Sequence, residues 1–148
     1  MNTAKLFKYN NPHPKGKRVG DCVKRAITLA SGKDYMKVQR DLNKFKKITK
    51  SSVFNDPKNY KYYIENILNG KKITFQAEKG KSRMTGWLFA IDHPTGTYIL
   101  RMAGHLSCCI DGQINDTWDC SHKCVYNVWE IKWGGKIVKT LKYTKRKE

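Results

Sequence analysis

The spacing of hydrophobic residues changes near Gly70, and this change constrains the fold of the 148-residue chain more than any other feature. Before Gly70 the apolar residues recur every three or four positions, which is typical of helices that bury one face. After Ile73 they alternate with polar residues, which is typical of strands. The sequence therefore predicts an α+β fold, with N-terminal helices followed by an antiparallel sheet, in a single domain over residues 1–148.

Three helices are expected in the front part of the chain. The first begins near Cys22, and Asp21 stands in the capping position before it. The second begins at about Asp34. Pro57 suits the first turn of the third helix, which is expected to end at Gly70.

The strongest strand signal in the back part is a hairpin. Asp111 and Gly112 stand between two alternating runs, and this dipeptide favours a two-residue turn. A short apolar run at 86–91 lies in the same strand-rich part. Other strands are expected at residues 73–77, 97–102, 105–110, 113–118, 125–133 and 136–143.

Targeting signals are missing from the sequence. No apolar run approaches the roughly 18 residues of a membrane span, so no membrane partner is expected. Residues 1–20 are polar and basic, unlike a signal peptide, and we expect a cytoplasmic protein (in the host cytoplasm if it comes from a phage). The 5 cysteines are an odd number, so reduced thiols are expected, each one a packing residue, a metal ligand or a nucleophile.

The chain is strongly basic, with 30 Lys and Arg against 12 acids and a formal charge of +18. Such a field attracts polyanions but does not identify a partner, so nucleic acid is one candidate partner. The densest run of basic residues lies in the last residues of the sequence, and we interpret it as a solvated basic C-terminal tail from about residue 142. This run comprises Lys142, Lys145, Arg146 and Lys147.

Cys22 is a candidate nucleophile because of its place at a helix start. Amides without acceptors and a partial positive charge gather there, and both favour a thiolate. Positive side chains also lie close in sequence: Lys17, Arg18, Lys24 and Arg25. The alternative is that Cys22 is a small buried residue of the helix.

His105 and Asp116 are brought together by the register of the predicted hairpin. If Ile110 faces Gln113, Ser107 faces Asp116, and His105 becomes a diagonal neighbour on the same face, with Cα atoms about 7–8 Å apart. Asn115 and Asp119 point to the other face. An acid at this place can orient the imidazole of a general base. The alternative is an edge histidine beside a solvated aspartate.

Two blocks of the sequence together resemble the small papain-like cysteine peptidases and amidases of phage and bacterial genomes. Residues 20–27, Gly-Asp-Cys-Val-Lys-Arg-Ala-Ile, resemble the helix that carries the family's cysteine. Residues 104–112 and 116–119 resemble the strands that carry its histidine and its acid, whereas residues 36–83 match nothing in the family. The resemblance implies a papain-like fold, a peptide or protein substrate and no cofactor.

The resemblance also implies a mechanism through a thioester. Cys22 would attack a carbonyl, His105 would take and return the proton, and Asp116 would orient His105. The oxyanion would lie at the Cys22 amide and one side-chain donor. The family carries a glutamine before its nucleophile where this chain has Gly16, and the candidate replacements are Asn10, Asn11 and Lys17.

A second class of function is a zinc-stabilised binding module. The candidate ligands are Cys108, Cys109, Cys120, His122 and Cys124. The spacing is atypical of zinc sites, and neighbouring residues of a strand point to opposite faces. We therefore expect no bound metal and interpret Cys108 and Cys109 as packing residues.

A third class is a basic binding protein that has a catalytically inactive papain-like fold. An example would be a phage factor that acts on nucleic acid or on a host protein. Aromatic residues alternate with lysine at 60–63 and at 129–133, as in platforms on which bases stack. The same pattern is produced by core segments with lysine on the wet side, and we favour that interpretation.

Overall fold

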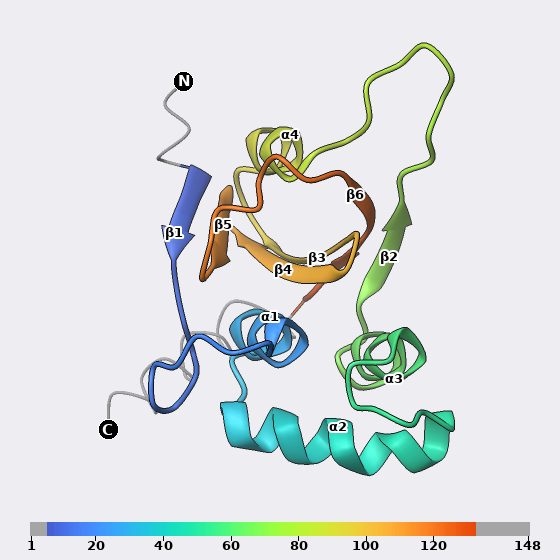
Figure 1. Cartoon of the computed structure of the whole chain (residues 1–148). Helices are drawn as coiled ribbons and strands as arrows, with labels where there is room; N and C mark the ends of the chain where they lie inside the picture. Colours follow the sequence, from blue (N-terminus) through green and yellow to red (C-terminus); the bar gives the residue numbers. More distant parts are fainter. Residues whose placement is uncertain (1–5, 133–148) are drawn as a thin grey trace.

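The computed structural model describes residues 6–132, which form an α+β structure of four helices and a six-stranded mixed sheet (Figure 1). The strand expected at 136–143 and the basic tail lie outside the described residues. The elements follow the chain in the order β1 (Phe7–Tyr9), α1 (Cys22–Ser31), α2 (Tyr35–Thr49), α3 (Pro57–Tyr62), β2 (Lys71–Thr74), α4 (Gly86–Asp92), β3 (Thr97–Met102), β4 (His105–Ile110), β5 (Gln113–Asp116) and β6 (Val125–Glu130).

The strand order of the sheet is β1-β5-β4-β3-β6-β2. Neighbouring strands are antiparallel except at one edge, where β1 runs parallel to β5 and Phe7 pairs with Ile114. The expected antiparallel sheet is therefore observed from β2 to β6, but the sequence did not predict β1, which makes the sheet mixed. Three residues are too short for a period of two to be detected, and β1 forms through pairing with a distant part of the chain.

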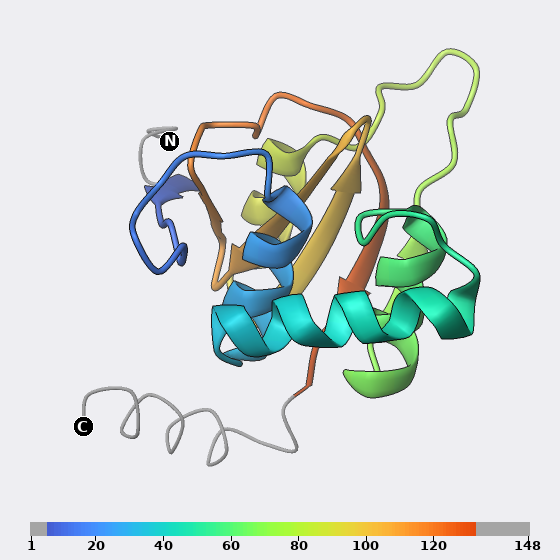
Figure 2. The same ribbon diagram turned by 60° about the horizontal axis from the view of Figure 1, so that its bottom comes forward.

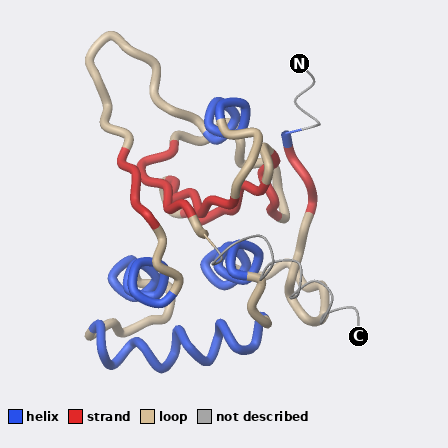
Figure 3. Tube along the Cα trace, turned by 180° about the vertical axis from the view of Figure 1, so that it is seen from behind, coloured by secondary structure: helices blue, strands red, loops and turns tan. Residues whose placement is uncertain are grey.

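The helices cover both faces of the sheet. Helices α1 and α3 lie against one face and α4 against the other, while α2 crosses α1 and α3 on the outside (Figures 1, 2 and 3). A buried core fills each interface: Ile27, Leu42, Tyr63 and Trp129 belong to the core on the α1 side, and Phe89, Leu100 and Val128 to the core on the α4 side. The helix that begins with Cys22 is thus fixed on the sheet.

Helix α4 corrects the expectation of strand structure through most of the chain after Ile73. The Thr85 side chain accepts a hydrogen bond from the Leu88 amide and caps the helix. Gly86, Phe89 and Ala90 recur at helical spacing and are buried. An apolar run this short fits a buried strand equally well, so the sequence pattern does not distinguish a helix from a strand here.

The helix starts were predicted at the correct residues, but not all of their caps. The Asp34 and Asp56 carboxylates accept hydrogen bonds from amides of the first turns of α2 and α3. The Asp21 side chain makes no such bond. The third helix also ends earlier than expected, since a single π-helical turn occupies Tyr63–Ile67.

The predicted hairpin and its register are confirmed. Asp111 and Gly112 have φ angles of 48° and 77°, so both have the positive φ that a type I′ turn requires. Ile110 pairs with Gln113. A Cβ at Gly112 would lie 3.2 Å from the Cα of Pro94, so the turn also packs closely against the chain after α4.

Among residues 6–132, no helix combines the length and the apolar character needed to cross a lipid bilayer.

Candidate active site

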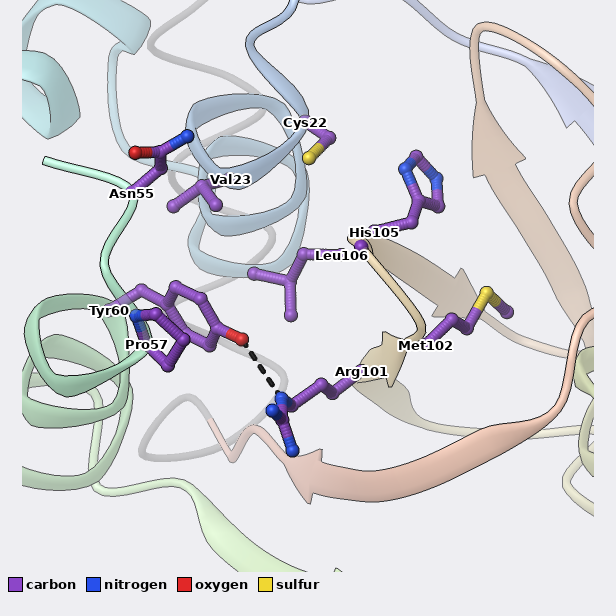
Figure 4. A pocket seen from close by; sticks show the side chains of 10 residues that line it. Cys22, Val23, Asn55, Pro57, Tyr60, Arg101, Met102, His105 and Leu106 are labelled. Carbon is purple, nitrogen blue, oxygen red and sulfur yellow. Dashed lines mark hydrogen bonds between the residues drawn. The ribbon is translucent and has the colours of Figure 1, made fainter. Parts of the chain in front are cut away.

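Three predicted site residues meet at one end of the sheet. Cys22 is the first residue of α1, His105 the first residue of β4 and Asp116 the last residue of β5. Figure 4 shows the Cys22 thiol and the His105 ring beside each other. The fold therefore brings together side chains that are more than 80 residues apart in sequence, through the packing of α1 on β4.

The His105 ring is held by Asp116. Its Nε2 lies 2.7 Å from Oδ2 of Asp116, as the hairpin register predicted. The other ring nitrogen, Nδ1, is therefore the one that is free to serve Cys22, and Figure 4 shows one ring nitrogen turned toward the thiol. Trp118 packs on the imidazole, with ring centroids 4.9 Å apart. The orientation of the imidazole ring is therefore fixed by Asp116 and Trp118.

The surroundings of Cys22 favour its thiolate. Burial alone would raise the pKa of the thiol, but several interactions outweigh it and lower the pKa. They are, in order of size, a hydrogen bond from His105, a hydrogen bond from the Leu106 amide and the positive charges of His105 and Arg25. A thiol with a lowered pKa is a stronger nucleophile near neutral pH because more of it is ionised.

The pKa of His105 moves in the opposite direction. Burial opposes the imidazolium, yet hydrogen bonds with Asp116, Cys120 and Cys22 raise the pKa of His105 well above its ordinary value. The charge of Asp116 acts in the same sense. A raised imidazole pKa beside a lowered thiol pKa describes a thiolate–imidazolium ion pair.

Asp116 is a fully engaged carboxylate. Its Oδ2 accepts hydrogen bonds from the Ser107 hydroxyl at 2.6 Å and from the Cys120 thiol at 3.4 Å, besides that from His105. Its Oδ1 accepts from the Thr117 amide at 2.7 Å. Burial would raise the pKa of this carboxyl, but these bonds, with that to His105 first, keep it below its ordinary value. The acid therefore stays ionised and can orient His105.

Arg25 is a site residue that the sequence interpretation did not identify as one. Only 5% of it is exposed, and its guanidinium lies 3.3 Å from Oδ1 of Asp116. It also forms an ion pair with Asp21, whose other oxygen accepts a hydrogen bond from Tyr35 at 2.7 Å. This is why Asp21 does not cap α1. The spacing of four between Asp21 and Arg25 was the available signal for their pairing.

The candidate zinc ligands are not gathered as the zinc hypothesis required. Cys108 packs in the core on the α1 side, and Cys109 packs in the core on the α4 side. Within residues 6–132, the group with metal-ligand geometry is His105, Asp116 and Cys120, with ligand atoms within 4.8 Å of one another. His122 and Cys124 are not part of it. A metal in this group would replace the hydrogen bond between His105 and Asp116.

The side chains expected to replace the glutamine donor are engaged elsewhere or lie at the surface. The Asn10 amide donates to Asn115 at 3.0 Å, and the Asn11 amide donates to the Lys17 carbonyl at 3.0 Å. Lys17 itself is exposed. The Cys22 amide remains a candidate oxyanion donor, because it is among the helix-start amides that have no intrahelical acceptor.

Two hollows flank the contact between Cys22 and His105. One is lined on its far side by Asn55, Pro57, Tyr60 and Arg101, and the other by Arg18, Val19, Gly20 and Trp118. Cys22, His105 and Gly104 line both. An extended chain laid across the two hollows would place its backbone over the thiol.

Three aromatic residues of the two segments considered as stacking platforms belong to the core, as the favoured interpretation predicted. Tyr60, Tyr63 and Trp129 are 6%, 0% and 0% exposed. The ring of Trp129 packs edge-on against that of Tyr60. These side chains offer no free faces on which bases could stack. Trp133, the last residue of the second platform, lies outside the described residues.

Comparison with models of protein families, with curated proteins and with solved structures finds no match to this chain.

Proposed function

We propose that this protein is a thiol-dependent hydrolase or acyl-transfer enzyme with a papain-like fold. The observation that carries the proposal is the arrangement of Cys22, His105 and Asp116: the imidazole is hydrogen-bonded to the carboxylate at 2.7 Å and lies beside the thiol, in surroundings that lower the pKa of the thiol and raise that of the imidazole. The fold assignment is supported by the order of the three residues, a cysteine at a helix start followed by a histidine and an acid on neighbouring strands.

In the first step, the Cys22 thiolate attacks the carbonyl carbon of an amide. A C–S bond forms, and the carbonyl π electrons move to the oxygen, which the Cys22 amide stabilises as an oxyanion. The His105 imidazolium then gives its Nδ1 proton to the leaving nitrogen. The C–N bond breaks, the oxyanion returns to a carbonyl, and the acyl group remains on Cys22 as a thioester.

In the second step, neutral His105 takes a proton from a water molecule or from an acceptor nucleophile. The new oxygen or nitrogen bonds to the acyl carbon, and the C–S bond breaks. Cys22 leaves as the thiolate and the imidazolium is restored. Throughout, Asp116 keeps its proton-free form and holds Nε2, so that Nδ1 faces the reacting atoms.

The test is the rate at which iodoacetamide modifies each cysteine, measured by peptide mass spectrometry at about pH 6, where an ordinary thiol is almost fully protonated. Cys124 is an internal control because it is half-buried like Cys22, whereas the other three cysteines are buried. Selective modification of Cys22 is the expected result. Equal rates at Cys22 and Cys124 would contradict the proposal and favour a basic binding protein on an inactive fold.

Turnover is tested with a pool of unstructured peptides whose cleavage is followed by mass spectrometry. Cys22→Ser is expected to abolish cleavage with the fold intact, since a hydroxyl is nearly isosteric with a thiol but far less acidic. Cleavage that persists in this variant would contradict the assignment of the nucleophile.

A further inference from the structure

Arg101 lies in the hollow that contains the thiol. It belongs to β3, directly beside Leu106 of β4, the residue that follows His105. The same hollow is lined by Cys22, His105, Asn55 and Tyr60. Figure 4 shows the Arg101 side chain turned toward the Tyr60 hydroxyl, with Leu106 between this pair and Cys22. A group bound at Arg101 would therefore belong to a molecule that also reaches the thiol.

The guanidinium of Arg101 has only neutral partners among the described residues. Its Nε donates to the Tyr60 hydroxyl at 3.1 Å, and one Nη donates to the amide oxygen of Asn127 at 3.3 Å. No carboxylate in residues 6–132 is within ion-pair distance of it. By contrast, Arg25, which is buried and lines the other hollow beside Cys22, forms ion pairs with two aspartates.

The hydroxyl of Tyr60 is prepared to take part in anion binding. It accepts the hydrogen bond from Arg101, so its own proton is available to a further acceptor. Tyr60 is 6% exposed and packed against Trp129, which holds this hydroxyl in place. A fixed O–H beside a guanidinium offers a carboxylate two kinds of donor at once.

Two lysines add positive charge near Arg101. Burial lowers the pKa of Lys61, the charges of Arg101 and Lys72 lower it further, and the charge of Glu65 acts in the opposite sense. Lys61 is therefore close enough to Arg101 and to Lys72 to be repelled by both, with Glu65 as the counter-charge. A bound anion would relieve this repulsion, whereas a neutral or cationic group would not.

We propose that this hollow binds an acidic side chain of the peptide substrate, whose carboxylate pairs with Arg101 and accepts the proton of Tyr60. The inference rests on the proposed function, because it names the class of substrate that the Cys22 site would take. Acidic residues close to the scissile amide would be preferred over their neutral amide counterparts.

The test uses two probes of nearly equal shape, N-chloroacetyl-aspartic acid α-amide and N-chloroacetyl-asparagine α-amide. Each alkylates a thiolate, and they differ in the charge of one side chain. The measured quantity is the ratio of their second-order rates at Cys22. We expect about a tenfold preference for the acidic probe, the size of one charge-assisted hydrogen bond.

Two variants separate the local site from the field of the whole protein. Arg101→Gln is expected to reduce the preference for the acidic probe to the level that the net positive charge of the whole protein produces. Arg101→Lys is expected to retain part of the preference. Arg18→Gln is the matched control, because it removes the same charge from the hollow on the opposite side of Cys22. It is expected to leave most of the preference.

The outcomes distinguish this inference from the function on which it rests. Rapid alkylation by both probes without acidic preference, or an equal loss in Arg18→Gln and Arg101→Gln, overturns the inference alone. Slow alkylation of Cys22 by both probes, no faster than that of Cys124, overturns the proposed function and the inference with it.

Discussion

The guanidinium of Arg25 lies 3.3 Å from Oδ1 of Asp116, and this ion pair joins the helix that begins with Cys22 to the strand that carries the acid. Arg25 follows Cys22 by one turn of α1, and Asp116 holds His105 through its other oxygen. A buried ion pair therefore links the helix that carries the thiol to the strand that carries the acid. We expect the position of the thiol relative to the imidazole to depend on this ion pair.

Removal of Arg25 is expected to destabilise the fold strongly. Arg25→Leu leaves Asp21 buried without its cation and removes one of the two cations beside Asp116, and the loss of one partner from a buried pair costs about 3–5 kcal/mol of unfolding free energy. Urea unfolding monitored by circular dichroism measures this loss.

The control for Arg25 is Lys37→Ala, which breaks the pair between Lys37 and Asp41 on the surface of α2. The Lys37 side chain is 54% exposed, so its pair is expected to contribute less than about 1 kcal/mol. Losses of equal size in the two variants would show that the Arg25 network does not stabilise the fold as argued.

The ion pair of the site predicts a distinctive dependence of stability on pH. The raised pKa of His105 contributes stability that is complete below its ordinary value of 6.5 and is lost as the pH rises toward about 11. The lowered pKa of Cys22 contributes stability that is complete above its ordinary value of 9.0 and is lost as the pH falls. Below pH 9.0, as far down as Cys22 stays ionised in the folded protein, the two slopes have opposite signs.

Cys22→Ser tests whether the two slopes oppose each other. With the thiolate gone, the His105 slope remains, because Asp116 still raises its pKa. The unfolding free energy of the variant is expected to fall relative to that of the wild type as the pH rises toward 9.0, the ordinary pKa of the thiol. Urea unfolding at several pH values measures the difference, and a difference that does not change with pH contradicts the ion pair.

Asp116 is expected to act through His105 rather than on the substrate. Asp116→Asn removes the charge that favours the imidazolium, so the alkylation rate of Cys22 at neutral pH should fall, by about 10–100-fold, less than in His105→Ala. The pH at which Cys22 becomes reactive should rise at the same time. Asp119→Asn, three residues later and exposed, is the control and should change neither. An unshifted pH profile in Asp116→Asn would remove Asp116 from this role.

The protein is expected to need no metal. Treatment with a chelator should change neither its thermal unfolding nor the reactivity of Cys22, and elemental analysis of the purified protein should find no stoichiometric zinc. The group of His105, Asp116 and Cys120 is where a metal would contradict this prediction. One zinc ion per protein molecule, lost in Cys120→Ser and needed for the fold, would show that the group is a structural metal site.

The parts of the site that depend on local chemistry could be predicted from the sequence. Asp111 and Gly112 require one turn type, and that turn fixes the register that brings His105 to Asp116. Likewise, the start of α1 at Cys22 follows from helical spacing and a capping-type residue. In both cases the deciding residues are neighbours in sequence.

The parts that depend on distant contacts could not be predicted. The pairing of β1 with β5 joins segments more than 100 residues apart and involves only three residues of β1. The role of Arg25 arises because Asp116 arrives beside it in the folded chain. Whether a short apolar run such as that of α4 becomes a helix or a strand depends on the surface that it packs against. The sequence pattern alone does not reveal that surface.

Whether Cys22 and His105 form a thiolate–imidazolium pair can be read from the pH profile of Cys22 alkylation. The rate with iodoacetamide is measured from about pH 4 to 10 in the wild type and in His105→Ala. We expect the wild-type rate to reach a plateau well below the pH at which an ordinary thiol ionises, and His105→Ala to shift the rise to that higher pH. Superimposed profiles, both rising near the ordinary thiol pKa, would contradict it.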